Sequence, residues 1–378
     1  MKENTYTIEY LKKLFEIIIQ EEESTNNIKI KGNIFTLGEY YKSSLLKENL
    51  KITKPINSLN HLTAPIRFGG WFNKSDKTTI VIINKMYEYM EAISTSSLTN
   101  LIHKIYHELR HRYQDKFMKN ANKYTEFFII LEKIIIINDP AYYRLNHDSF
   151  LIEIDADKNA INKTETLLKK KNIIDEDSKK YINEVNKSIN ERSILYNSIN
   201  MFEKFHFILE GKVKKHKKNS ENPLNDSIIE LNSNTDSQEY NSIKRVLSYI
   251  YNQDGSFKSI KEILDSKKEI DINIINTVLC SKPFIKSIKL NTLEKSEIKY
   301  MLELLEILYQ EIAEKIKILK KINTNEETLL YLYTEKKMTK KLKETITLRS
   351  VLMNTLLNEK KNNNNITLYD YIKKRKSK

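Results

Sequence analysis

Apolar residues recur at three- and four-residue steps along much of the chain, and this pattern predicts a mostly helical protein. With only 6 Gly and 5 Pro in 378 residues, few helix breakers interrupt these stretches. Between residues 97 and 119 the repeating apolar positions are Leu98, Leu101, Ile102, Ile105 and Leu109. The other predicted helices cover residues 7–23, 123–137, 148–171, 177–209, 241–265, 295–322 and 325–358.

Two short segments depart from this helical pattern. Residues 64–72 and 78–83 are rich in β-prone residue types, and they flank a polar turn at 73–77. This arrangement predicts a β-hairpin. The expected fold class is therefore mainly α with a small β-sheet, an α+β arrangement.

A loss of periodicity between residues 210 and 240 predicts a boundary within the chain. The stretch opens with the basic run 212–218 and continues rich in Ser, Asn, Asp and Glu, with a proline at Pro223. Such a composition is typical of a flexible polar linker. We therefore expect a first domain over 1–209, a linker over 210–240 and a basic helical domain over 241–378.

The strongest chemical signal in the sequence is HELRH at residues 107–111. His107 and His111 are four residues apart, so on a helix their rings project from the same face. Two imidazoles at that spacing can share one tetrahedral zinc ion. Glu108 lies beside them, where its carboxylate can reach a metal-bound water. Chance would produce this pattern in about one chain in a hundred of this composition.

A second motif lies downstream, where residues 153–157 read EIDAD on a predicted helix. Together with HELRH it resembles the zincin metallopeptidases of the gluzincin type, over roughly residues 60–170. The resemblance implies that Glu153 is the third ligand of Zn²⁺ and that Asp157 orients a ligating imidazole through its free N–H. It also implies a zincin-like metallopeptidase domain followed by a helical C-terminal region. The subfamily stays open between a general peptidase and a regulatory one that cleaves a specific partner.

The implied enzyme is a zinc hydrolase that cuts peptide bonds in a peptide or protein substrate, with Glu108 as general base. His147 is an alternative third ligand, which would give a three-histidine site. His103, one turn before the motif, is less suited, because three imidazoles along one straight helix do not easily converge on one ion. Tyr142, Tyr143 and His147 are candidates for stabilising the oxyanion, and Tyr143 is our choice as the second catalytic residue.

The net charge of +14 falls mostly after residue 208. A basic back half can attract an acidic partner or nucleic acid, although no nucleic-acid motif accompanies the charge. The alternative to an enzyme is therefore a catalytically inactive, basic helical binding or regulatory protein, in which the HELRH site is structural or degenerate.

Three further observations bear on the cellular location expected for the protein. The lone cysteine, Cys280, excludes an intramolecular disulfide and is expected to be a core residue. No secretion signal is recognisable at the start of the sequence. The most apolar run, residues 127–137, contains Glu132 and Lys133 and is too short to span a membrane. We therefore expect a cytoplasmic protein.

Overall fold

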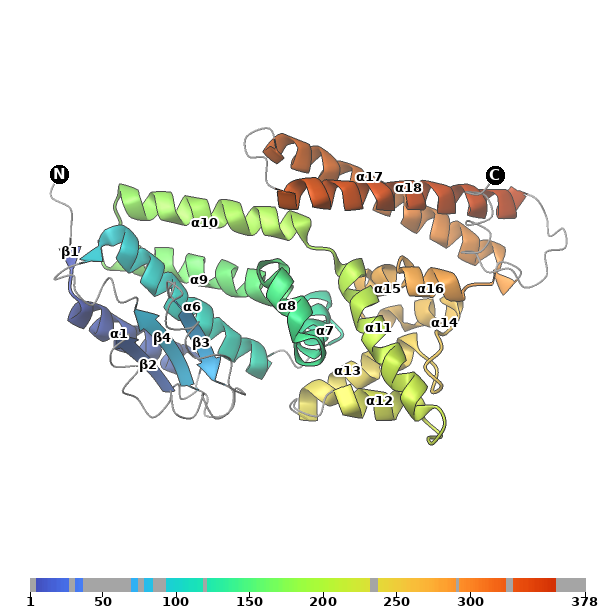
Figure 1. The fold of residues 1–378 in the computed structure, drawn as a ribbon, viewed down its shortest axis with the longest axis horizontal. Helices are drawn as coiled ribbons and strands as arrows, with labels where there is room; N and C mark the ends of the chain where they lie inside the picture. Colours follow the sequence, from blue (N-terminus) through green and yellow to red (C-terminus); the bar gives the residue numbers. More distant parts are fainter. Residues whose placement is uncertain are drawn as a thin grey trace. The chain divides into compact units, whose positions relative to one another are not determined.

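The structure, a computed structural model, describes residues 5–26, 31–36, 69–73, 78–83, 93–117, 121–231, 237–289, 292–323 and 329–357 (Figure 1). Within these ranges the protein is mainly helical, which confirms the principal expectation from the sequence. Residues 64–68 and 74–77 of the expected hairpin region, and the basic tail after residue 357, lie outside the described residues.

The chain divides into two compact units, and the division differs from the expected one. The first unit consists of residues 1–117 and 152–193, and the second of residues 118–151 and 194–378. Residues 118–151 and 194–209, which we expected in the first domain, therefore fold with the back half of the chain. Periodicity along the sequence could not reveal this, because it shows where helices form but not which of them pack together.

The described part of the first unit contains four long helices and a group of short strands (Figure 1). The apolar stripe predicted for the HELRH helix is buried, since Leu98, Leu101, Ile102 and Ile105 are inaccessible to solvent. The helices are α1 (Ile8–Asn26), α6 (Thr95–Phe117), α9 (Leu151–Lys170) and α10 (Glu176–Leu195).

The strands of the first unit form two small pairings. Strand β4 (Thr78–Ile83) lies between β2 (Lys31–Thr36), which is parallel to it, and β3 (Gly69–Asn73), which is antiparallel. The antiparallel pair lies in the segment where the sequence predicts a hairpin. Two-residue strands, β1 (Thr5–Tyr6) and β5 (Ile93–Ser94), pair separately just before α6 begins.

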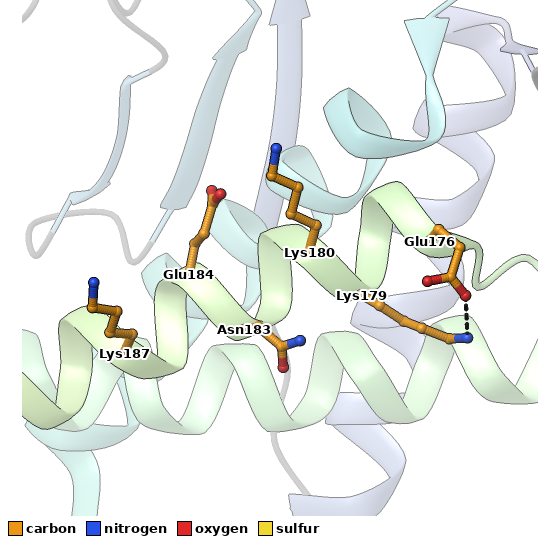
Figure 2. Close-up of a pocket in the computed structure, with 6 residues that line it drawn as sticks. All are labelled: Glu176, Lys179, Lys180, Asn183, Glu184 and Lys187. Atoms are coloured by element: carbon orange, nitrogen blue, oxygen red, sulfur yellow. Dashed lines mark hydrogen bonds and ion pairs between the residues drawn. The ribbon is translucent and has the colours of Figure 1, made fainter.

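Helix α10 has charged side chains on its exposed side and polar contacts to neighbouring helices on its inner side. Figure 2 shows the outer surface, where Lys180, Glu184 and Lys187 point to the same side of the helix and Glu176 pairs with Lys179 at 2.7 Å. All six side chains drawn there belong to this one helix. On its inner side, Arg192 donates to Asp157 of α9, and the hydroxyl of Tyr181 lies 3.0 Å from Nδ1 of His103 on α6.

The second unit surrounds a strongly apolar helix, α7 (Tyr124–Asn138), in which residues 127–135 are all buried. It packs against α11 (Ser198–His216), and its Lys133 forms a buried ion pair at 2.8 Å with Glu239. The most apolar run of the sequence is thus largely a buried helix. No helix in the described part of the chain is both long and apolar enough to cross a bilayer.

Further helices complete the second unit, and the last two are 29 residues long each and pack against one another. Cys280, at the end of α15, is buried, as expected of a core residue, and burial raises the pKa of its thiol to about 12. These helices are α8 (Pro140–Asn146), α12 (Pro223–Leu231), α13 (Ser237–Ile250), α14 (Ile260–Asp265), α15 (Ile272–Leu279), α16 (Lys282–Ser287), α17 (Lys295–Asn323) and α18 (Leu329–Leu357).

The structure corrects the flexible linker expected at 210–240. Helix α11 continues to His216, and α12 occupies residues 223–231. Pro223 is the first residue of α12, a position where its missing N–H costs nothing. Leu224, Ile228 and Leu231 follow at helical spacing and are buried. The polar composition between these apolar positions concealed a short amphipathic helix.

Candidate metal centre

Helices α6 and α9 bring together the two histidines of HELRH and the glutamate of the downstream motif. The Nε2 atoms of His107 and His111 are 3.0 Å apart. One carboxylate oxygen of Glu153, Oε2, lies 3.3 Å from His107 Nε2 and 3.4 Å from His111 Nε2. Among the described residues, these three form the group whose donor atoms could hold a metal ion.

The spacing of these three atoms fits a tetrahedral metal ion. Bonds of 2.0–2.1 Å to a tetrahedral zinc place neighbouring ligand atoms about 3.3–3.4 Å apart. The three measured separations, 3.0, 3.3 and 3.4 Å, are close to that edge length. Two imidazole nitrogens and one carboxylate oxygen are also a donor set that zinc accepts, with a fourth position left for water or substrate.

Each histidine is oriented by a hydrogen bond at its other ring nitrogen. Nδ1 of His107 donates to Oδ1 of Asp157 at 2.6 Å. The other oxygen of Asp157 accepts from Arg192 Nη2 on α10 at 2.5 Å. Because a carboxylate held in an ion pair can only accept, the proton of neutral His107 lies on Nδ1 and the lone pair on Nε2 faces Glu153. The contact implied for Asp157 by the resemblance is therefore present.

His111 is oriented by a residue that the sequence analysis did not single out. Its Nδ1 lies 2.8 Å from Oε1 of Gln114, which is almost fully buried one turn later on the same helix. The position three residues after His111 is the one signal that could have indicated Gln114, since residues at that spacing lie on the same helical face. A lone glutamine carries no motif of its own, so the sequence did not reveal it.

The electrostatics of the group formed by His107, His111 and Glu153, hereafter the cluster, favour a positive charge between the three donor atoms. Burial lowers the pKa of His107, but the hydrogen bonds to Asp157 and Glu153 outweigh it and raise that pKa to about 10. Burial likewise opposes the charged form of His111, yet Glu153 raises its pKa above the ordinary value. For Asp157, burial is offset by His107 and the nearby cations, which lower its pKa.

Glu108, the predicted general base, is buried next to the first of the two histidines in the sequence. Glu108 is 7% exposed, and the charges of His107, His111 and Glu153 act on its carboxylate. Burial raises its pKa, although the two histidines oppose the shift. Among the described residues, none donates a hydrogen bond to its carboxylate. The group is thus available to accept a proton from a molecule bound at the cluster.

The other histidines and the tyrosine considered for the site lie outside the three-residue group. His103 lies outside the three-residue group, with Nε2 at 3.4 Å from Asp157 Oδ1 and Nδ1 at 3.0 Å from Tyr181. Tyr143 and His147 belong to the second unit, where their ring centroids are 5.0 Å apart. The role of Tyr143 at the oxyanion and the alternative of His147 as a metal ligand stay predictions.

The two aspartates of the second motif, Asp155 and Asp157, each form an ion pair with an arginine from another helix. Arg110 binds Asp155 with both Nε, at 2.8 Å, and Nη2, at 3.2 Å. Arg192 binds Asp157, as described above. Both arginines therefore form ion pairs within the first unit.

Comparisons of the chain with protein-family models, with curated protein sequences and with solved structures give no match.

Proposed function

We propose that this protein is a zinc-dependent peptidase whose centre is His107, His111 and Glu153. The observation that carries the proposal is the convergence of three donor atoms at separations of 3.0–3.4 Å, with both imidazoles turned so that their Nε2 atoms face the same point. A solvated helix face would not orient one buried and one partly buried histidine in this way. Zinc suits the mixed nitrogen and oxygen donors better than magnesium or calcium, which prefer oxygen ligands.

The proposed chemistry divides between the bound ion and Glu108, which is not a ligand of it. When bound, zinc acts as a Lewis acid that polarises a scissile carbonyl and makes water more acidic. Glu108 takes the proton of the attacking water and then delivers it to the leaving amine. Burial raises the pKa of Glu108, and a more basic carboxylate accepts the proton more readily.

A peptide substrate is supported by the sheet beside the metal helix. Strand β3 is at an edge of the described sheet, in the order β2-β4-β3, and it contacts α6. An extended peptide can add to such an edge by main-chain hydrogen bonds, which would lay its backbone alongside α6. This gives the hydrolase a substrate class, a peptide or protein segment in an extended conformation.

The proposal is tested by metal analysis of the purified chain, prepared without chelator. We expect about one zinc per wild-type chain, and its loss in both His107→Ala and Glu153→Ala. Lys169→Met is the matched control, because Lys169 pairs with Glu165 on the exposed side of α9, away from the cluster. Absence of bound metal in the wild type, even after zinc is added back, would overturn the proposal.

Glu108→Gln separates catalysis from metal binding. This variant keeps the three donor atoms but removes the proton acceptor, so we expect full zinc content with peptide hydrolysis reduced by at least about 100-fold. A wild-type chain that binds zinc but cuts none of a broad panel of peptides would instead identify a degenerate site in a basic binding protein.

A further inference from the structure

Both the nitrogen and the oxygen of the Gln114 side-chain amide take part in hydrogen bonds, and these bonds determine how the amide is oriented. Its Nε2 donates to the carbonyl oxygen of Ile152 at 2.8 Å and to Oδ2 of Asp155 at 2.7 Å. Both partners are acceptors only, so the nitrogen of the amide must face them and the oxygen must face away. That oxygen, Oε1, lies 2.8 Å from Nδ1 of His111.

The orientation of Gln114 has a direct consequence for His111. An amide oxygen accepts and cannot donate, so Nδ1 of His111 must carry a proton. In the neutral ring this leaves the lone pair on Nε2, the atom that faces His107 and Glu153. The opposite tautomer would place two acceptors against each other at Gln114 and remove the donor atom from the cluster.

Asp155 is itself held by Arg110, which binds it through two nitrogens. The side chains therefore form one continuous series from the partly exposed Arg110 to the metal cluster, through Asp155, Gln114 and His111. Asp155 accepts three hydrogen bonds in this series, two from Arg110 and one from Gln114. A carboxylate that lost Arg110 would hold the amide of Gln114 less firmly.

We propose that Gln114, held in place by Asp155 and Arg110, is a positioning residue that keeps His111 in the tautomer able to bind the metal. This inference deepens the proposed function, because it assigns residues outside the three ligands to the same site. It also gives the two imidazoles different partners, since His107 faces an anionic carboxylate and His111 a neutral amide.

The first test reads the tautomer directly and needs no metal. In the metal-free chain, labelled with ¹⁵N-histidine and held at a pH where the His111 ring is neutral, the single ring proton of His111 should lie on Nδ1, and the His111→Asn spectrum identifies its signals. In Gln114→Leu, a substitution of similar size, the proton should move to Nε2. An unprotonated Nδ1 in the wild type, or an unchanged tautomer in the variant, would overturn the proposal. Failure to bind zinc would leave this readout intact while removing the proposed function.

The second test measures whether Arg110 acts through Gln114. Zinc affinity, measured by competition with a chelator, should fall by about 10- to 100-fold in Gln114→Leu and by less in Arg110→Met. In the double variant the loss should equal that of Gln114→Leu alone, because the series is already broken. Additive losses would show that Arg110 acts independently, and Lys169→Met should change nothing. Circular dichroism of each metal-free variant checks that the fold is kept.

Discussion

Nδ1 of His107 lies 2.6 Å from Oδ1 of Asp157, and the second oxygen of the same carboxylate is bound by Arg192. One side chain of α9 thus orients a histidine of α6 and anchors α10. The aspartate is kept ionised by this arrangement, since its cationic and donor partners outweigh the effect of burial and lower its pKa.

Replacing Asp157 should therefore weaken metal binding without removing it. In Asp157→Ala the imidazole of His107 loses both its orientation and its anionic partner, and we expect zinc affinity to fall by about 10- to 100-fold. Competition with a chelator measures the change. Glu165→Gln, on the exposed side of the same helix, is the control and should bind zinc like the wild type.

A pair of neighbouring isoleucines tests the helix found in place of the expected linker. Ile228 is 1% exposed and Ile229 is 50% exposed. We expect Ile228→Ala to lower the free energy of unfolding by about 2–5 kcal/mol, through lost burial and the cavity left behind. Ile229→Ala should change it by about 0.5 kcal/mol or less. Equal effects in urea titrations of the two variants would favour a flexible segment.

The buried ion pair between Lys133 and Glu239 offers a test of the second unit's core. Both side chains are about 5% exposed, and their charged atoms are 2.8 Å apart. Lys133→Met should destabilise the protein by about 3–5 kcal/mol, because it leaves a carboxylate buried without its cation. The double variant Lys133→Met, Glu239→Leu should recover most of that loss, as measured by urea unfolding.

His206 should make the stability of the second unit depend on pH. Burial lowers its pKa from 6.5 to about 4, and its ring stacks on Tyr251 and Phe257. A pKa that is lower in the folded state means that the unfolded chain takes up the proton first. Stability is therefore complete above pH 6.5 and falls as the pH is lowered towards 4, by up to about 3 kcal/mol.

The variant His206→Phe isolates this contribution, since it keeps an aromatic ring in the stack and removes the titrating group. Its overall stability should be lower, because Tyr251 loses a hydrogen-bond partner at 2.9 Å. The part of the pH dependence that His206 supplies between 6.5 and 4 should disappear from its unfolding midpoints. A slope identical to that of the wild type would contradict the assignment.

The sequence revealed those parts of the site that have a fixed spacing. His107 and His111 are one helical turn apart, so their shared face follows from helix geometry, and the resemblance added Glu153 and Asp157. Gln114, Asp155 and Arg192 acquire their roles only when three helices pack, and no spacing within the chain encodes that. The apolar stripe of α6 was predictable for the same local reason, whereas the membership of residues 118–151 in the second unit depends on tertiary contacts.

Residues 118–151 of the second unit lie in the sequence between the two stretches of the first unit, and this limits how the protein can be truncated. A chain ended at residue 209, the boundary that the sequence suggests, would keep α7 but lose α13 and α15, which pack against it. The most apolar helix of the protein would then face water, and we expect such a fragment to aggregate. A minimal metal-binding protein would have to omit residues 118–151 as well and join residue 117 to residue 152 through a new connection. The unit that contains His107, His111 and Glu153 is thus formed by two separate stretches of the chain.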